Sequence, residues 1–220
     1  MPLLLCPEIK GTFEYTLLQE LKNDNSGFFS NEGHINEPRV VAENVQEMCK
    51  RKFASCFQAG VIMQDLSDEL TRRSMGDICV VDAENFCYNI DVKTHNLSTD
   101  FNMPNLTSID RLSKYYSPSN TNYFFLVLLV EYTLTEIGVI FKSVKLFPIE
   151  SLSWDCLQIE ALGKGQIQIR NANDIVINAN YTRKQWMSEF YNRANAYYDK
   201  VVQKARERQR SMQSRANEWD

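Results

Sequence analysis

Three charged side chains near the middle of the chain have the types and spacing of a metal-dependent catalytic site. Asp91 and Lys93 stand two residues apart at the end of one apolar run, and Asp77 stands just before the preceding apolar run. Alternate residues of a strand share a face, so Asp91 and Lys93 would point to the same side. If the two runs pair as a hairpin, two carboxylates and an amine converge on one small volume.

The register of this hairpin decides whether the two carboxylates meet. The runs 78–81 and 86–92 are predicted to be strands, joined by a three-residue loop of a common hairpin length. Counting back along a regular ladder places Asp77 opposite Asp91. Directly opposed residues have Cβ atoms roughly 4.5–5.5 Å apart. The loop 83–85 is therefore the assumption on which the predicted pairing rests.

Like charges that face each other across a ladder are destabilising, and a divalent cation between them removes that cost. Mg²⁺ typically takes one or two protein carboxylates and keeps several waters and phosphate oxygens as its other ligands. The hairpin is therefore interpreted as a metal site with an ammonium group beside it. The alternative is a solvated hairpin whose acids never meet, because an Asp-x-Lys triplet alone is a weak signal.

Other acids compete for a place in this site. Asp82 lies five ladder positions from Asp77, roughly 16 Å away and on the opposite face, so the register favours Asp77. Glu84 stands in the predicted turn, where an acid is usually solvated. Glu43 lies in a predicted helix, where it is either a surface charge or a further acid that completes the site.

The sequence gives little support for catalysis by a side-chain nucleophile. The chain has only two histidines, His34 and His95, and no Ser-His-Asp or Cys-His set. His95 follows the triplet closely, which favours a contact with DNA phosphate or a supporting role. The run 163–165 is Gly-Lys-Gly without P-loop spacing, so it is either a close approach to a ligand or only a turn.

The apolar periodicity predicts the elements that would position these residues. Helices are predicted at 9–21, 38–59 and 106–115, and from Thr182, a good N-cap, to about 212. The inner stripe of the last helix is predicted to be Trp186, Phe190, Ala194, Tyr197, Val201 and Ala205. Strands are predicted at 78–81, 86–92, 123–132, 139–147 and 166–170, and 174–178 could pair with the last of these.

This order of elements predicts an α/β (α+β) fold with a central mixed β-sheet flanked by helices and a long C-terminal helix. One domain is expected over residues 1–220. It would comprise an N-terminal helical arm (1–36), a core (37–180), the C-terminal helix (181–212) and a tail (213–220).

The amino-acid composition indicates whether the chain could bind nucleic acid or a membrane. A net charge of -4 argues against a surface that is basic throughout, but a local basic face can still bind nucleic acid. The outer face of the last predicted helix has such an excess of basic side chains. The longest apolar run, 123–130, is too short to span a bilayer, so a cytoplasmic protein without a membrane partner is expected.

At the hairpin residues the chain resembles the PD-(D/E)xK nucleases. Gly76-Asp77 and Asp91-Val92-Lys93 match the two parts of that motif, with glycine where proline is usual. The resemblance narrows to type II restriction endonucleases of the blunt-cutting, EcoRV-like group. The segments that carry it are 91–98 followed by 104–106, and Gln166-Ile167-Gln168 followed by 182–186.

This resemblance implies a restriction-endonuclease-like core and a Mg²⁺-dependent enzyme, with Mn²⁺ able to substitute. Asp77 and Asp91 would bind the metal, Lys93 would position the attacking water, and Glu43 would be the helix acid. A homodimer would cut double-stranded DNA at a short palindrome and leave blunt ends, with a cognate DNA methyltransferase as functional partner. The DNA contacts implied are His95, Asn96, Asn102, Met103, Asn105, Lys164, Gln166 and Gln168.

Two alternatives stay open from the residues alone. The same core could belong to a structure-specific or repair nuclease, which would act on DNA shape and not on a defined sequence. The chain could also be a non-catalytic DNA-binding protein, although the intact set Asp77, Asp91 and Lys93 argues against that.

Overall fold

The computed structural model describes most of the chain. Its described ranges are residues 2–23, 38–57, 61, 63–67, 74–100, 102–136, 138–160, 165–178 and 180–219. Lys164 and His34 lie outside these ranges.

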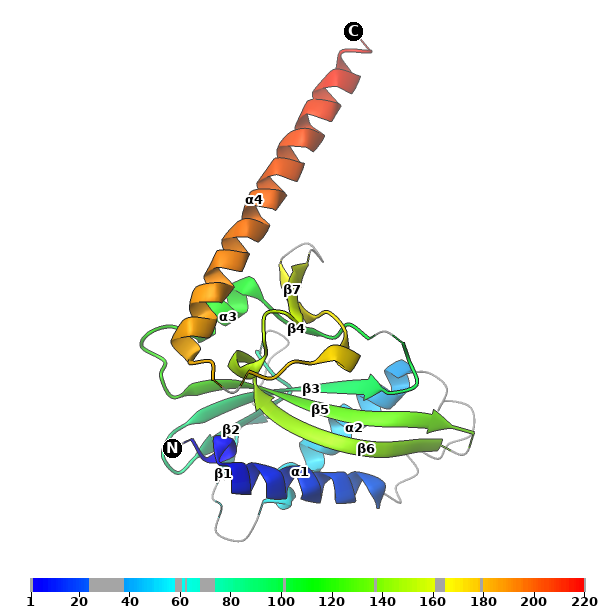
Figure 1. Ribbon diagram of the computed structural model, residues 1–220, viewed down its shortest axis with the longest axis vertical. Coiled ribbons are helices and arrows are strands. Elements are labelled where there is room, and N and C mark those ends of the chain that lie inside the picture. Colours follow the sequence, from blue (N-terminus) through cyan, green and yellow to red (C-terminus); the bar gives the residue numbers. More distant parts are fainter. Residues whose placement is uncertain are drawn as a thin grey trace.

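A mixed five-stranded sheet forms the centre of the fold, as predicted, with strand order β1-β2-β3-β5-β6 (Figure 1). Its strands are β1 (Met63–Asp65), β2 (Ile78–Asp82), β3 (Cys87–Asn96), β5 (Tyr123–Thr135) and β6 (Gly138–Pro148). Strands β3 and β5 pair in parallel, and the other neighbours pair antiparallel. The four longer strands confirm sequence predictions, whereas the short edge strand β1 was not predicted.

Strand β5 is buried on both faces, as its continuous apolar run indicates. One face packs in a cluster with α1 (Pro7–Lys22) and α2 (Pro38–Lys52). The other face packs under α3 (Ile109–Tyr115), the start of α4 and a second, smaller sheet. The central sheet therefore separates two hydrophobic cores, and any side chain on β3 faces one of them.

The smaller sheet has the order β4-β8-β7. Its strands are β4 (Asn105–Ser108), β8 (Gln166–Ile169) and β7 (Leu157–Glu160). The prediction of a helix over 106–115 is wrong at its start, because these residues first pair with β8 and Ser108 then caps α3 by accepting from Arg111 N. The suggested pairing of 174–178 with β8 is also wrong, since β4 and β7 occupy both edges of β8.

Helix α2 is shorter than predicted and ends at Lys52 instead of near residue 59. The Ser55 hydroxyl donates to the Lys52 carbonyl at 2.8 Å, an alternative to helical backbone pairing that serine readily offers. Phe53 nevertheless stays fully buried, as the predicted apolar face requires.

Helix α4 (Arg183–Ala216) begins with a capping box between Thr182 and Gln185, which confirms the predicted start. Trp186, Phe190 and Ala194 are buried as predicted. The inner stripe does not continue to Val201 and Ala205, which are exposed, because the body of the protein ends below them. The helix also runs on past residue 212, where a frayed tail was predicted, and projects away from the body (Figure 1).

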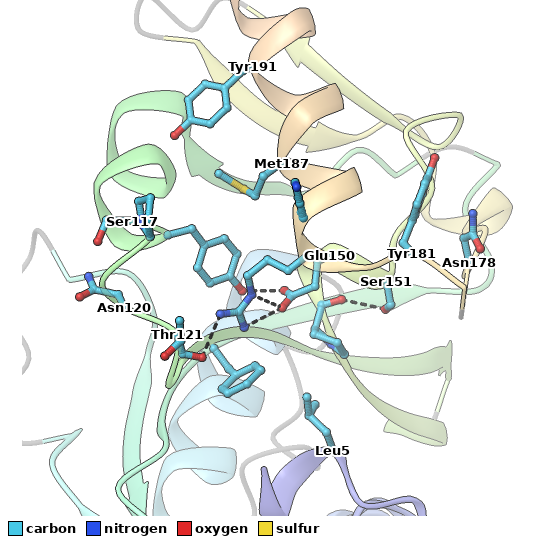
Figure 2. Close-up of a pocket in the computed structure, with 16 residues that line it drawn as sticks. Leu5, Ser117, Asn120, Thr121, Glu150, Ser151, Asn178, Tyr181, Met187 and Tyr191 are labelled. Carbon is cyan, nitrogen blue, oxygen red and sulfur yellow. Dashed lines mark hydrogen bonds and ion pairs between the residues drawn. The ribbon is translucent and has the colours of Figure 1, made fainter. Parts of the chain in front are cut away.

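A buried ion pair anchors the first turn of α4. Arg183 Nη2 lies 2.9 Å from Oε1 of Glu150, whose other oxygen accepts from the Tyr116 hydroxyl at 2.6 Å. The guanidinium also lies over the Tyr116 and Phe124 rings. Figure 2 shows this network among the side chains that line a pocket of about 880 Å³, to which none of the predicted site residues contributes.

No helix within the described ranges is both long and apolar enough to cross a membrane.

Candidate active site

The hairpin has the predicted register from Val81–Cys87 to Ile78–Ile90, the last pair of its ladder. Asp77 N then donates to the Ile90 carbonyl at 2.8 Å, so Asp77 and Ile78 both stand against Ile90 and the predicted position of Asp77 opposite Asp91 is not formed. The Asp77 carboxylate still reaches the strand of Asp91, because its Oδ2 accepts from Val92 N at 2.9 Å. The connecting loop has three residues, and the last of them, Asn85, has a φ of 62°. A left-handed residue in that position is typical of three-residue hairpin loops. The local sequence therefore determines the turn and the paired part of the hairpin, while Asp77 lies beyond its last pair.

Asp82 has a structural role in the same hairpin. Its carboxylate is buried and accepts hydrogen bonds from Phe86 N at 3.0 Å and from the Tyr88 hydroxyl at 2.7 Å. Leu3 N also donates to it at 3.4 Å, which ties the N-terminal segment to the turn. The predicted exclusion of Asp82 from the pair of candidate metal ligands agrees with this position.

Asp91 and Lys93 form a close pair on the sheet face that also carries Val127 and Leu129. Lys93 Nζ lies 2.8 Å from Asp91 Oδ1. The Asp91 side chain is buried, and its Oδ2 atom has no hydrogen-bond partner among the described residues. Burial raises the pKa of Asp91 to about 7, although the Lys93 ammonium partly opposes the rise and the Asp77 charge adds to it. The carboxylate is thus short of positive charge.

Asp77 is held by groups from two elements. Its Oδ2 accepts from Val92 N at 2.9 Å, and its Oδ1 accepts from the side-chain amide of Gln46 on α2. Sequence reasoning missed Gln46, although it stands one turn after Glu43 on the same helix face. Helix α2 therefore contributes the amide of Gln46 to Asp77, and not an acid.

Glu43 lies apart from this contact. Its side chain is 63% exposed and pairs with Arg39 Nε at 3.0 Å, one turn earlier on α2. No hydrogen bond links it to Asp77 or Asp91 among the described residues. The structure therefore places the predicted helix acid at the surface of α2, next to the residue that does reach the site.

His95 and Asn96 are both buried. Neither ring nitrogen of His95 has a hydrogen-bond partner in the described part of the chain, and Nδ1 lies 3.6 Å from Glu131 Oε1. Asn96 accepts from Ser98 N at 3.1 Å and so forms the turn that follows β3. Both side chains are therefore held inside the protein at the end of β3, and the contact with DNA that the resemblance implies stays a prediction.

Most of the remaining predicted contacts gather on one face of the smaller sheet. We call this the polar sheet face; its residues are Asn105, Gln158, Gln166 and Gln168. The Gln168 amide donates to Asn105 Oδ1, and Gln158 Nε2 lies 3.4 Å from Gln168 Oε1. Gln158 also contacts Met103 Sδ, at 2.9 Å. Gln158 was missed because β7 was not predicted, and only the alternation in 157–160 hinted at it.

Asn102 has a different partner, since its Nδ2 donates to the Thr94 carbonyl of β3 at 3.2 Å. This hydrogen bond connects the segment before β4 to the strand that carries Asp91 and Lys93. The predicted reading segment and the predicted catalytic strand are thus in direct contact.

No protein-family model and no curated protein sequence matches this chain.

The fit to Mg²⁺ can be judged from the donors themselves. No cluster of three or more His, Cys, Asp or Glu residues is arranged to hold a metal ion within the described ranges. Mg²⁺ needs only one or two protein carboxylates, however. Asp91 offers a buried oxygen without a hydrogen-bond partner among the described residues, and the charge of Asp77 raises the pKa of Asp91 further. Both features favour a cation at this point, so the residues fit the ion.

The raised pKa of Asp91 predicts how the metal-free protein responds to pH. The folded state holds the Asp91 proton more tightly than the unfolded state, in which the pKa is near 3.8. The contribution of this group to stability is therefore full below about pH 4 and is lost as the pH rises through 7. Between pH 5 and pH 8 the loss amounts to about 2–3 kcal/mol.

This dependence is checked by urea denaturation in EDTA at both pH values, on the unmodified chain and on Asp91→Asn. We expect the unfolding free energy of the variant to depend less on pH by that amount. Identical pH dependence in the two proteins would show that burial of the Asp91 charge is not costly.

Proposed function

We propose that this protein is a Mg²⁺-dependent type II restriction endonuclease, which hydrolyses phosphodiester bonds of double-stranded DNA at a short palindromic sequence and leaves blunt ends. The observation that carries the proposal is the contact of Lys93 with the buried Asp91 carboxylate, with the Asp77 carboxylate bonded to Val92 N between them in the chain. The pKa of the buried Asp91 carboxyl group is raised even though the Lys93 ammonium group lies beside it. Such a site suits a further cation bound together with a phosphate.

Asp77 and Asp91 would hold the metal. When bound, a Mg²⁺ ion supplies charge stabilisation at the phosphate and lowers the pKa of a bound water. Lys93 donates hydrogen bonds to the attacking water or to the phosphate oxygen on which negative charge develops. Gln46 fixes the orientation of the Asp77 carboxylate, because its amide donates to one oxygen while Val92 N donates to the other. Mn²⁺ is expected to replace Mg²⁺.

The polar sheet face is proposed to read the DNA sequence. Glutamine and asparagine side chains can bond adenine through two hydrogen bonds in the major groove. Gln168 is buried and bonds both Asn105 and Gln158, so it would orient these two more exposed amides toward the bases. The bond from Asn102 to the Thr94 carbonyl supports a fixed distance between this face and the catalytic strand.

A homodimer follows from the proposed palindromic site, since a twofold DNA sequence is matched by a twofold protein with one active site for each strand. A cognate DNA methyltransferase, which would protect the same sequence in the host DNA, is the functional partner proposed.

Digestion of a sequenced plasmid with Mg²⁺, followed by mapping of the fragment ends, tests this function. We expect discrete fragments with blunt ends at a short palindrome, the same fragments with Mn²⁺, and no cleavage in EDTA. Cleavage only at branched or damaged DNA would indicate a structure-specific or repair nuclease instead. DNA binding without cleavage under any of these conditions would indicate a non-catalytic DNA-binding protein.

A further inference from the structure

Helix α4 continues far beyond the core that anchors it. Its last buried side chain is Ala194, and every residue described from Tyr198 onward is exposed. At 1.5 Å per residue, the segment from Tyr198 to Ala216 extends by roughly 27 Å. Figure 1 shows it projecting alone from the body. A helical segment of this length is only marginally stable in water without a partner, so its sequence should show which partner it suits.

The charge of this segment is opposite to that of the rest of the chain. Residues 198–216 contain six basic side chains and two acids, a net charge of +4. Because the whole chain carries -4, all the other residues together carry -8. Lys200, Lys204 and Arg208 lie on successive turns of one helix face, four residues apart, and form no ion pair with any described residue. Like charges at this spacing destabilise a helix, unless an anion faces them.

We call Lys200, Lys204 and Arg208 the basic ladder. A groove of about 420 Å³ lies between its first two residues and the smaller sheet. Lys200 and Lys204 line it from α4, together with Arg193, which also pairs with Glu189. Arg170 and Gln158 line it from the sheet side, with Glu160 as its acid. Gln158 belongs to the polar sheet face as well, so the basic groove begins where that face ends.

We propose that Lys200, Lys204 and Arg208, with the groove at the base of this ladder, bind the sugar-phosphate backbone of duplex DNA beside the bases that the polar sheet face reads. Duplex DNA carries one negative charge per about 1.7 Å of its axis, which complements a row of cations on successive helix turns. The inference rests on the proposed function, to which it adds a segment that holds the DNA without reading its sequence.

A second copy of the chain is the other candidate partner. Exposed apolar side chains follow the same segment, including Tyr198, Val202, Met212 and Trp219. Two such helices packed side by side would, however, bring two segments of net charge +4 together. Duplex DNA relieves this charge, whereas a second copy increases it, so the observations favour DNA.

The test compares two charge-matched double variants by fluorescence anisotropy with labelled duplex DNA in EDTA, over roughly 50–200 mM salt. Lys204→Gln with Arg208→Gln removes two charges from the ladder. Lys22→Gln with Lys142→Gln removes two exposed charges from α1 and β6, elements of the opposite core. All four positions are exposed, and glutamine is a good helix former at those that lie in helices.

We expect the ladder variant to bind roughly tenfold more weakly at the lower salt, on specific and unrelated sequences alike. The slope of log affinity against log salt should fall in magnitude by roughly two, and the control variant should keep the original slope. Unchanged binding by the ladder variant would overturn the inference while leaving the nuclease proposal intact. A chain that binds DNA with this slope change but never cuts would preserve the inference and refute the nuclease activity.

Light scattering on the same proteins tests the competing partner. If the ladder variant keeps the oligomeric state of the unmodified chain while its DNA affinity falls, the contact with DNA is direct. If Met212→Ser converts a dimer to monomers and abolishes DNA binding with it, the segment is an interface between copies, and the inference is overturned.

Discussion

Replacement of Asp91 by asparagine is expected to reduce the rate of DNA cleavage by at least about a thousandfold, a loss typical of the removal of one essential charged group from a catalytic site. Asparagine keeps the shape of the side chain but cannot supply the negative charge that a metal ion requires. Lys93 also loses the carboxylate that positions its ammonium group at 2.8 Å. Affinity for the DNA should persist, because the proposed reading and backbone contacts lie on other elements.

This variant has a favourable property for such a test. Burial makes the charged form of Asp91 costly, so its removal should not destabilise the fold at neutral pH. Single-turnover cleavage and DNA binding are measured in parallel, with Glu84→Gln as a control at an exposed acid of the same hairpin. Cleavage by Asp91→Asn at the normal rate would refute the assignment of the metal site.

Replacement of Gly76 by alanine is expected to destabilise the protein by about 2–4 kcal/mol and to impair cleavage as well. A Cβ atom at this position would lie 2.6–2.8 Å from the O, N and C atoms of Ile90. These are backbone atoms of the central sheet, and the Ile90 carbonyl accepts from Asp77 N. The strand cannot yield without displacing Asp77. A proline would meet the same obstacle, so this close approach accounts for a glycine before Asp77.

Gly11→Ala is the matched control. An added Cβ there meets nothing within 4 Å, and the residue lies within helix α1. Alanine should therefore stabilise α1 by up to about 1 kcal/mol, the usual difference between the two residues in a helix. Urea denaturation gives both values. A Gly76→Ala protein within 0.5 kcal/mol (roughly the noise of a surface substitution) of the unmodified chain would show that the close approach is not required.

The features that sequence predicts correctly here are local ones. The hairpin register depends on a three-residue loop and two short apolar runs, and the start of α4 depends on Thr182 and Gln185. Both are decided by residues close together in the chain. The pairing of β2 with β3 could therefore be predicted without knowledge of the rest of the fold, whereas Asp77 lies beyond the last pair, Ile78–Ile90, and outside the predicted register.

The features that sequence missed depend on distant partners. Gln46 reaches Asp77 across 31 positions of sequence, and β4 forms because β8 offers an edge to residues that have helical spacing. Helical periodicity likewise predicted Val201 to face inward, but a periodic stripe cannot show where the core beneath it ends. Burial of His95 follows from the packing around Glu131, which no local pattern specifies.

The anchoring of α4 at one end has a mechanical consequence. The helix is fixed by the Arg183 ion pair, by the buried rings of Trp186 and Phe190 and by the partly buried Tyr197, while every described residue beyond Tyr197 is exposed. A straight helix of this kind acts as a lever arm whose fulcrum is its first three turns. From Tyr197 to Ala216, the end of the helix, each degree of tilt moves the tip by roughly half an ångström. A small tilt at the base of α4 would thus displace the far end of the helix while strand β3 keeps its position.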